Sequence, residues 1–129
     1  MKVLFVSLNI LTPMIRLFDY SVAMLSAYLK PLGHEIEVVE INKESDLDKH
    51  LAPAIEAFAP DVIGMNGCAY QGPYFPDVTE TARREAPKAL LIAGGWHASI
   101  APERTLRDAG LDFVLAGEGE IALAAWLED

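Results

Sequence analysis

The sequence predicts a three-layer α/β domain in which helices cover both faces of a five-stranded parallel sheet. Apolar runs rich in β-branched residues alternate with amphipathic stretches along the chain, which is the pattern of repeated βα units. The central runs are apolar without alternation, as is typical of strands buried on both faces. The 129 residues fit one domain, spanning 1–129, with one hydrophobic core.

Five short apolar segments are predicted to be the strands of this sheet. Each is too short for a stable helix and is bounded by turn or helix signals. The segment at the N-terminus is also too short for a signal peptide, so we interpret it as the first strand. The predicted strands cover residues 2–8, 35–41, 61–66, 89–93 and 113–116.

Helices are predicted between these strands. The first, over 20–32, has apolar residues at helical spacing and ends at Gly33, whose missing Cβ permits a left-handed turn. The second covers 46–59, and Pro60 prevents its continuation. The others cover 76–85, 102–109 and 118–127. Because parallel connections are almost always right-handed, these units predict a doubly wound sheet of the flavodoxin-like or Rossmann-like type.

The charge and hydropathy of the chain exclude several kinds of partner. A formal net charge of −9 disfavours contact with nucleic-acid backbones and with anionic membrane surfaces. No apolar run approaches the length of about 18 residues that a membrane-spanning helix needs. We therefore expect a cytoplasmic protein that binds neither nucleic acid nor membrane, and a homodimer is left open.

Cys68 is the only cysteine of the chain. It cannot form an intramolecular disulfide, a cysteine-rich zinc site or the cysteine cradle of an iron–sulfur cluster. We expect no metal ligands from the protein. Cys68 could be the nucleophile of a stand-alone enzyme only if a base such as His97 lay beside it.

Doubly wound sheets bind ligands at the carboxyl ends of their strands, so the loops that follow the strands hold the candidate site residues. The loop after the first strand contains Asn9, Leu11 and Thr12. It lacks the glycine spacing of a dinucleotide site and the composition of a phosphate loop. Instead of contacting a ligand, this loop could be a buried connection that packs on the first helix.

The loop after the third strand is small and rich in glycine. Such residues allow a bulky ligand to lie close to the backbone, although turn geometry alone would also explain the glycines. The candidate ligand contacts in this region are Asn66, Gly67, Cys68 and Tyr70.

The last two loops supply the remaining candidates. Gly94 and Gly95 follow the fourth strand and remove side chains that would obstruct a ligand. His97 could face that ligand or form a structural hydrogen bond. Gly117 and Glu118 stand at the start of the last predicted helix, where the glutamate could cap the helix or bind the ligand.

Several short segments, taken in their order and spacing, resemble the cobalamin-binding domain of B12-dependent radical S-adenosylmethionine (SAM) proteins. They are PDVIG at 60–64, GGWHAS at 94–99, GLDFV at 110–114 and GEGE at 117–120. The resemblance covers nearly the whole chain. It implies a module that holds cobalamin with the nucleotide tail directed toward the sheet. The upper face of the cofactor would be turned to a radical SAM barrel that follows in the same parent chain and carries S-adenosylmethionine and a 4Fe-4S cluster.

The resemblance also assigns residues to the cofactor. Gly94 and Gly95 match the position that makes room for the tail, 64–68 matches a stretch that contacts it, and 117–120 lies in the ligand crevice. The Asp-x-His-x-x-Gly motif, whose histidine replaces the lower axial base in other cobalamin proteins, is absent. This predicts base-off cobalamin without a histidine ligand, its lower face covered by the loop over 9–14, with His97 as the alternative ligand.

The remaining histidines, His34 and His50, are predicted to lie at the start of the second strand and on a helix surface, away from cobalt. The Cys-x-x-x-Cys-x-x-Cys motif of radical SAM domains is absent as well. We therefore interpret the chain as a fragment that binds a cofactor and is not itself catalytic, from a parent that is a radical SAM methyltransferase or a related enzyme. The alternative is a vestigial Rossmann-like scaffold that mediates domain association or homo-oligomerisation without a cofactor.

Overall fold

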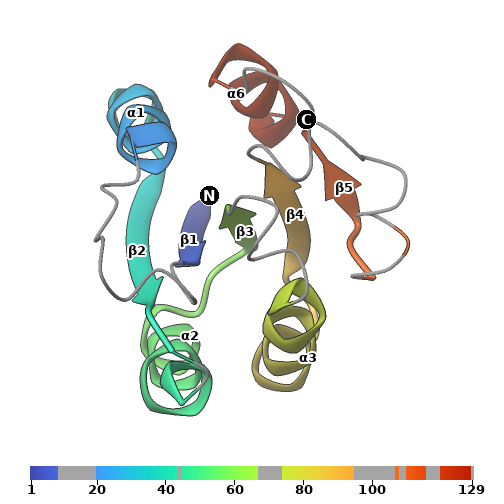
Figure 1. Ribbon diagram of the computed structural model, residues 1–129. Coiled ribbons are helices and arrows are strands. Elements are labelled where there is room, and N and C mark those ends of the chain that lie inside the picture. The colour runs from blue at the N-terminus through green and yellow to red at the C-terminus, as the bar shows by residue number, and fades with distance from the viewer. Residues whose placement is uncertain are drawn as a thin grey trace.

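A computed structural model describes residues 1–8, 20–43, 45–66, 74–94, 107, 110–115 and 120–128. Within them, five strands form one parallel sheet between two helical layers (Figure 1). Helices α1 (Tyr20–Leu29) and α6 (Glu120–Glu128) cover one face, and α2 (Ala52–Phe58) and α3 (Phe75–Glu85) cover the other. The predicted three-layer α/β fold is confirmed.

The strand order of the sheet is β2-β1-β3-β4-β5, which is the order of flavodoxin-like folds. The strand order reverses at β1, because β2 is added on one side of it and β3 on the other. The strands are β1 (Lys2–Leu8), β2 (Glu35–Ile41), β3 (Val62–Asn66), β4 (Leu90–Gly94) and β5 (Phe113–Val114). At the outer edge, β2 exposes Glu35, Glu37 and Glu40.

Several element bounds differ from the prediction. The helix predicted over 46–59 consists of a π-helical segment η2 (Leu47–Leu51) followed by α2. Pro53 lies in the first turn of α2 and has no N–H to continue regular α-helical hydrogen bonding. Likewise, Lys30–Leu32 forms a 3-10 turn, η1, after α1. Of the helix predicted over 102–109, the described residues include only Arg107.

Buried side chains form a separate core on each face of the sheet. Because side chains alternate along a strand, β1 contributes to both cores, with Phe5 on the α1/α6 face and Leu4 on the α2/α3 face. The α1/α6 core also contains Val3, Val22, Leu29, Val62, Ile92, Leu123, Ala124 and Leu127. No helix in the described part of the chain is long and apolar enough to cross a membrane.

Two aspartates align neighbouring strands in the same way. The backbone N–H of Asp61 donates to Lys2 O (2.8 Å), and its Oδ2 accepts from Lys2 N–H (2.9 Å). Asp112 repeats this arrangement with Leu91, at 2.8 Å and 2.9 Å. Two of the segments that carry the family resemblance, PDVIG and GLDFV, therefore contain an aspartate that sets strand register.

Candidate functional site

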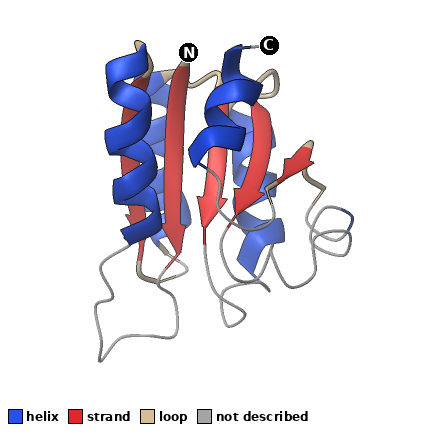
Figure 2. Ribbon diagram, turned by 90° about the horizontal axis from the view of Figure 1, so that it is seen from above, coloured by secondary structure: helices blue, strands red, loops and turns tan. Residues whose placement is uncertain are grey.

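The carboxyl ends of the central strands meet at one edge of the sheet. Figure 2 shows the long strands running in the same direction. At this edge Ser7 of β1 pairs in register with Asn66 of β3, which in turn pairs with Gly94 of β4. The strand order reverses at β1, and doubly wound sheets bind ligands beside such a point. The Ser7–Asn66–Gly94 row is therefore the candidate site.

This row lies on the α1/α6 face of the sheet. Phe5 and Ile92 each stand two residues before a member of the row, and both pack in the α1/α6 core. Since residues two apart along a strand share a face, Ser7 and Gly94 are on that face too. The layer therefore changes from apolar to small and polar residues as it approaches the carboxyl edge.

The two glycines on this face are needed for different reasons. A Cβ added to Gly64 would lie 3.0 Å from Cδ1 and 3.2 Å from Cε1 of Phe5, so core packing requires a glycine. A Cβ added to Gly94 would meet only Leu115 O, at 3.8 Å, among the described atoms. Neither glycine has a positive φ. Neither packing nor backbone conformation in the described structure thus requires Gly94, which agrees with a role in making room for a ligand.

Ser7 is a site candidate that the sequence patterns did not identify. It is 2% exposed and is the one hydroxyl residue in the otherwise apolar strand KVLFVSL. A hydroxyl near the carboxyl end of a buried strand was the available signal, because polar side chains are uncommon at buried strand positions.

Asn66 and Gly94 are the predicted site residues that the structure describes, and it brings them together in adjacent strands. The other predicted contacts lie outside the described residues, so their assignment stays a prediction. They are Asn9, Leu11, Thr12, Gly67, Cys68, Tyr70, Gly95, His97, Gly117 and Glu118.

The two described histidines are placed as predicted, at the start of the second strand and on a helix surface. His34 precedes β2, and its Nδ1 is 3.1 Å from the amino group of Met1, at the amino edge of the sheet. His50 belongs to η2, on the α2/α3 side, and its side chain is 60% exposed. No cluster of three or more potential metal-binding side chains occurs among the residues that the structure describes.

Asp46 is a buried carboxylate near the start of η2. Its Oδ2 accepts the Asn42 N–H at 2.9 Å, and its Oδ1 is 3.4 Å from His50 Nε2. The backbone hydrogen bond lowers the pKa of Asp46 most strongly, burial opposes this shift, and the charge of His50 lowers the pKa further. Asp46 therefore stabilises the turn that joins β2 to η2.

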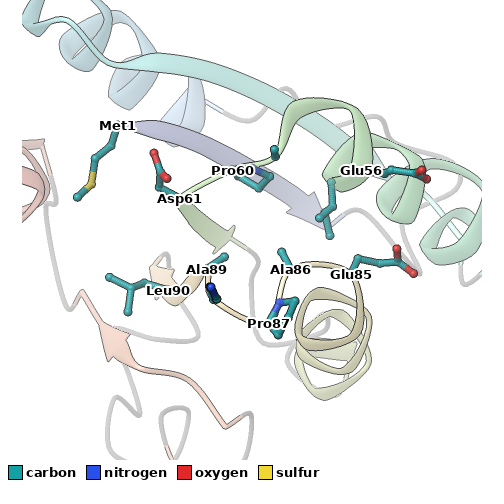
Figure 3. Close-up of a pocket in the computed structure, with 12 residues that line it drawn as sticks. Met1, Glu56, Pro60, Asp61, Glu85, Ala86, Pro87, Ala89 and Leu90 are labelled. Atoms are coloured by element: carbon teal, nitrogen blue, oxygen red, sulfur yellow. The ribbon is translucent and has the colours of Figure 1, made fainter.

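An open groove of about 670 Å³ lies on the opposite edge of the sheet. Its lining includes Met1, Pro60, Asp61 and Leu90, and Figure 3 shows them around the amino ends of the central strands. Ligands of doubly wound sheets bind at the carboxyl edge, so this groove is not the candidate site.

The chain matches one protein-family model and several named relatives. A family model described as "B12 binding domain" matches residues 8–127. Cytidylyl-2-hydroxyethylphosphonate methyltransferase from Streptomyces wedmorensis is 24% identical over 129 residues, covering 86% of this chain and 24% of that protein. Hopanoid C-3 methylase from Methylococcus capsulatus is 30% identical over 119 residues, covering 88% of this chain and 22% of that protein. The chain thus spans about a quarter of the length of these relatives.

A solved structure shows the same fold. The cobalamin-dependent S-adenosylmethionine radical enzyme OxsB, with aqua-cobalamin and S-adenosylmethionine bound, superposes with a TM-score of 0.78 at 20% identity. The match covers 98% of this chain and 18% of OxsB. Because the family model extends over nearly the whole sequence, the chain belongs to the B12 binding domain family, and its cofactor is cobalamin, as the family resemblance implied.

Proposed function

We propose that cobalamin binds at the carboxyl edge of the sheet, with its nucleotide tail entering the α1/α6 layer along the Ser7–Asn66–Gly94 row. The observation that carries this proposal is the change of this layer from apolar to small and polar residues at the point where the strand order reverses. Space beside Gly94, where a Cβ would have no close contact with described atoms, supports it.

The chemistry of the row fits the tail of the cofactor. The tail carries a phosphate, a sugar and a base, which need hydrogen-bond donors and acceptors. The Ser7 hydroxyl can both donate and accept, and the Asn66 amide offers donors and an acceptor. A glycine at 94 lets a wide group approach the backbone closely. Neutral polar groups, rather than lysine or arginine, would therefore contact the tail at this row.

We further propose that cobalamin binds base-off and without a histidine ligand to cobalt. The chain has no Asp-x-His-x-x-Gly motif, His34 lies at the amino edge, and His50 lies on the α2/α3 side. Bound cobalamin would supply the metal-centred chemistry, and its axial ligation is one of the levers by which a protein tunes it. In this arrangement the protein binds and orients the cofactor.

The longer protein to which this domain corresponds is, we propose, a radical SAM methyltransferase. Two relatives carry methyltransferase or methylase names and are about four times as long as the matched region. One cysteine is too few for an iron–sulfur cluster, so the cluster and S-adenosylmethionine would belong to a separate radical SAM domain. The described domain would bind cobalamin and catalyse no reaction alone.

The test is an absorbance titration of the purified domain with hydroxocobalamin, followed by desalting. We expect the corrin bands to co-elute with the protein and to have the base-off form. The variant Gly94→Leu fills the space beside the strand end and should abolish retention. The control, Ala57→Leu, adds a comparable side chain at an exposed position of α2 and should retain cobalamin. Equal retention by the two variants would exclude the proposed tail path.

A role in protein association is the second candidate, and the outer surface of α1 and η1 favours it. Met24, Tyr28 and Leu32 are 54%, 44% and 49% exposed and follow one another at helical spacing. Apolar side chains in such a row are typical of contacts between proteins. Gel filtration with and without cobalamin separates the two roles, because an association scaffold would form dimers whether or not the cofactor is present.

A further inference from the structure

The last strand, β5, has little sheet pairing of its own. Among the described residues, its register with β4 consists of Ile92 with Phe113 and Ala93 with Val114. So short a strand is only marginally held by sheet hydrogen bonds. Contacts outside the sheet therefore help to hold its position.

Arg83 of α3 and Asp112 form a clamp at the amino end of β5. Asp112 Oδ2 accepts from Arg83 Nη2 at 3.1 Å and from Leu91 N–H at 2.9 Å. Arg83 Nη2 also donates to Gly110 O at 3.3 Å. Charge-assisted hydrogen bonds of this kind are stronger than neutral ones. The Arg83–Asp112 clamp thus ties α3 and β4 to the turn that precedes β5.

The other end of β5 forms part of the proposed cofactor site. Leu115 N–H donates to Ala93 O at 2.9 Å. The carbonyl oxygen of Leu115 is the described atom nearest to a Cβ built on Gly94, at 3.8 Å. A shift of β5 would therefore change the width of the space beside Gly94.

We propose that Arg83 is a positioning residue for the cobalamin site. It acts through Asp112, which fixes β5 and with it the Leu115 carbonyl beside Gly94. The inference rests on the proposed tail path along the Ser7–Asn66–Gly94 row. Arg83 itself belongs to α3, on the opposite face of the sheet from that row. It therefore does not contact the cofactor.

The clamp is expected to matter more for binding than for overall stability. The side chains of Arg83 and Asp112 are 39% and 36% exposed, and ion pairs in such settings contribute little to folding. A variant that breaks the clamp should therefore remain folded, while β5 and the wall of the site lose one of the contacts that hold them.

The chain offers a matched control for each half of the clamp. Arg84, the next residue of α3, has its Nη2 3.5 Å from Asp48 and its Nε 3.2 Å from Glu85. Asp61 makes the same pair of backbone contacts as Asp112, at the amino end of β3. Arg84→Gln is the control for Arg83→Gln, because both remove a positive charge and its ion pairs on α3. Asp61→Asn is the control for Asp112→Asn, because both alter a carboxylate that accepts a backbone N–H of a neighbouring strand.

The experiment measures the cobalamin dissociation constant of these four variants and of Arg83→Lys by absorbance titration, with thermal unfolding in parallel. We expect Arg83→Gln and Asp112→Asn to weaken binding about tenfold, the scale seen when supporting partners of a cofactor site are removed. Arg84→Gln and Asp61→Asn should change it less than about twofold, and Arg83→Lys should restore part of the affinity. Equal weakening by Asp61→Asn and Asp112→Asn, or unchanged binding by Arg83→Gln, would overturn the inference.

A second measurement tests the clamp without cobalamin and separates its failure from failure of the proposed function. Hydrogen exchange of the Leu115 amide reports local opening of β5. We expect faster exchange in Arg83→Gln than in Arg84→Gln. If the wild-type protein retains no cobalamin but Leu115 still exchanges faster in Arg83→Gln, the proposed cofactor site is refuted and the Arg83–Asp112 clamp is supported. Equal exchange in the two variants refutes the clamp.

Discussion

Gly64→Ala offers a direct test of the packing on the α1/α6 face of the sheet. The added methyl group would lie 3.0 Å and 3.2 Å from two ring carbons of Phe5, and 3.5 Å from Ile92 Cγ1. The Phe5 side chain is 3% exposed, so its ring cannot move into solvent. The methyl group must therefore push the ring or the strand aside.

The expected cost follows from two opposing effects. Overpacking a core by one methyl group costs about 1–3 kcal/mol. Replacing glycine by alanine in a strand recovers about 0.5–1 kcal/mol, because the unfolded chain loses conformational freedom. We therefore expect Gly64→Ala to lower the free energy of unfolding by up to about 2.5 kcal/mol, which corresponds to about 4 °C in Tm for each kcal/mol at this chain length.

Gly94→Ala is the matched control, since its methyl group meets only Leu115 O at an ordinary contact distance of 3.8 Å. It should leave the free energy of unfolding unchanged or raise it by up to about 1 kcal/mol. The assay is urea unfolding of wild type and both variants, monitored by circular dichroism, with equal m-values as the check for two-state behaviour. Equal stabilities for the two variants would refute the proposed difference between the glycines.

Three further predictions concern a helix cap, a buried carboxylate and the histidines. Ala59 ends α2 with φ 51° and ψ 61°, so Ala59→Gly should raise stability by about 0.5–1 kcal/mol in urea unfolding; a decrease in stability would contradict the left-handed cap. The folded pKa of Asp46 lies below 3.8, so its charged form stabilises the protein above that pH and this contribution is lost as pH falls through the lower folded value. Asp46→Asn should therefore weaken the pH dependence of Tm below about pH 4. The same dependence of Tm on pH in the variant and in wild type would contradict this role of the Asp46 carboxylate. Replacing His34 and His50 together by alanine should leave the spectrum of bound cobalamin unchanged, whereas a spectral change in His97→Ala would identify that residue as the axial ligand.

Much of the fold could be predicted from local sequence patterns. Short apolar segments identified the first four strands within about one residue. The central strands are apolar without alternation because helices cover both faces of the sheet there. Strand bounds shifted where contacts distant in sequence decide them: Asp61, predicted to begin the third strand, is instead the bridging residue before it. The π-helical start of the second helix depends on how Pro53 is accommodated, which propensity alone does not show.

The candidate site was predictable in part. Asn66 and Gly94 stand at the ends of apolar runs, and the rule that ligands bind at carboxyl strand ends identifies them without knowledge of the register. Ser7 was missed because its importance arises from its pairing with Asn66 across the sheet. The structural roles of Asp61 and Asp112 in strand alignment could not be predicted either, since each contacts a residue in a neighbouring strand. Side-chain partners separated by many residues are not visible in local patterns.

The exposed carboxylates of β2 limit how copies of this domain can meet. An outer strand with free backbone groups is a template on which another strand can add. Glu35, Glu37 and Glu40 lie along this strand, so two copies aligned strand to strand would bring rows of like charge together and repel each other. The β2 edge is thereby protected from growing into a continuous intermolecular sheet.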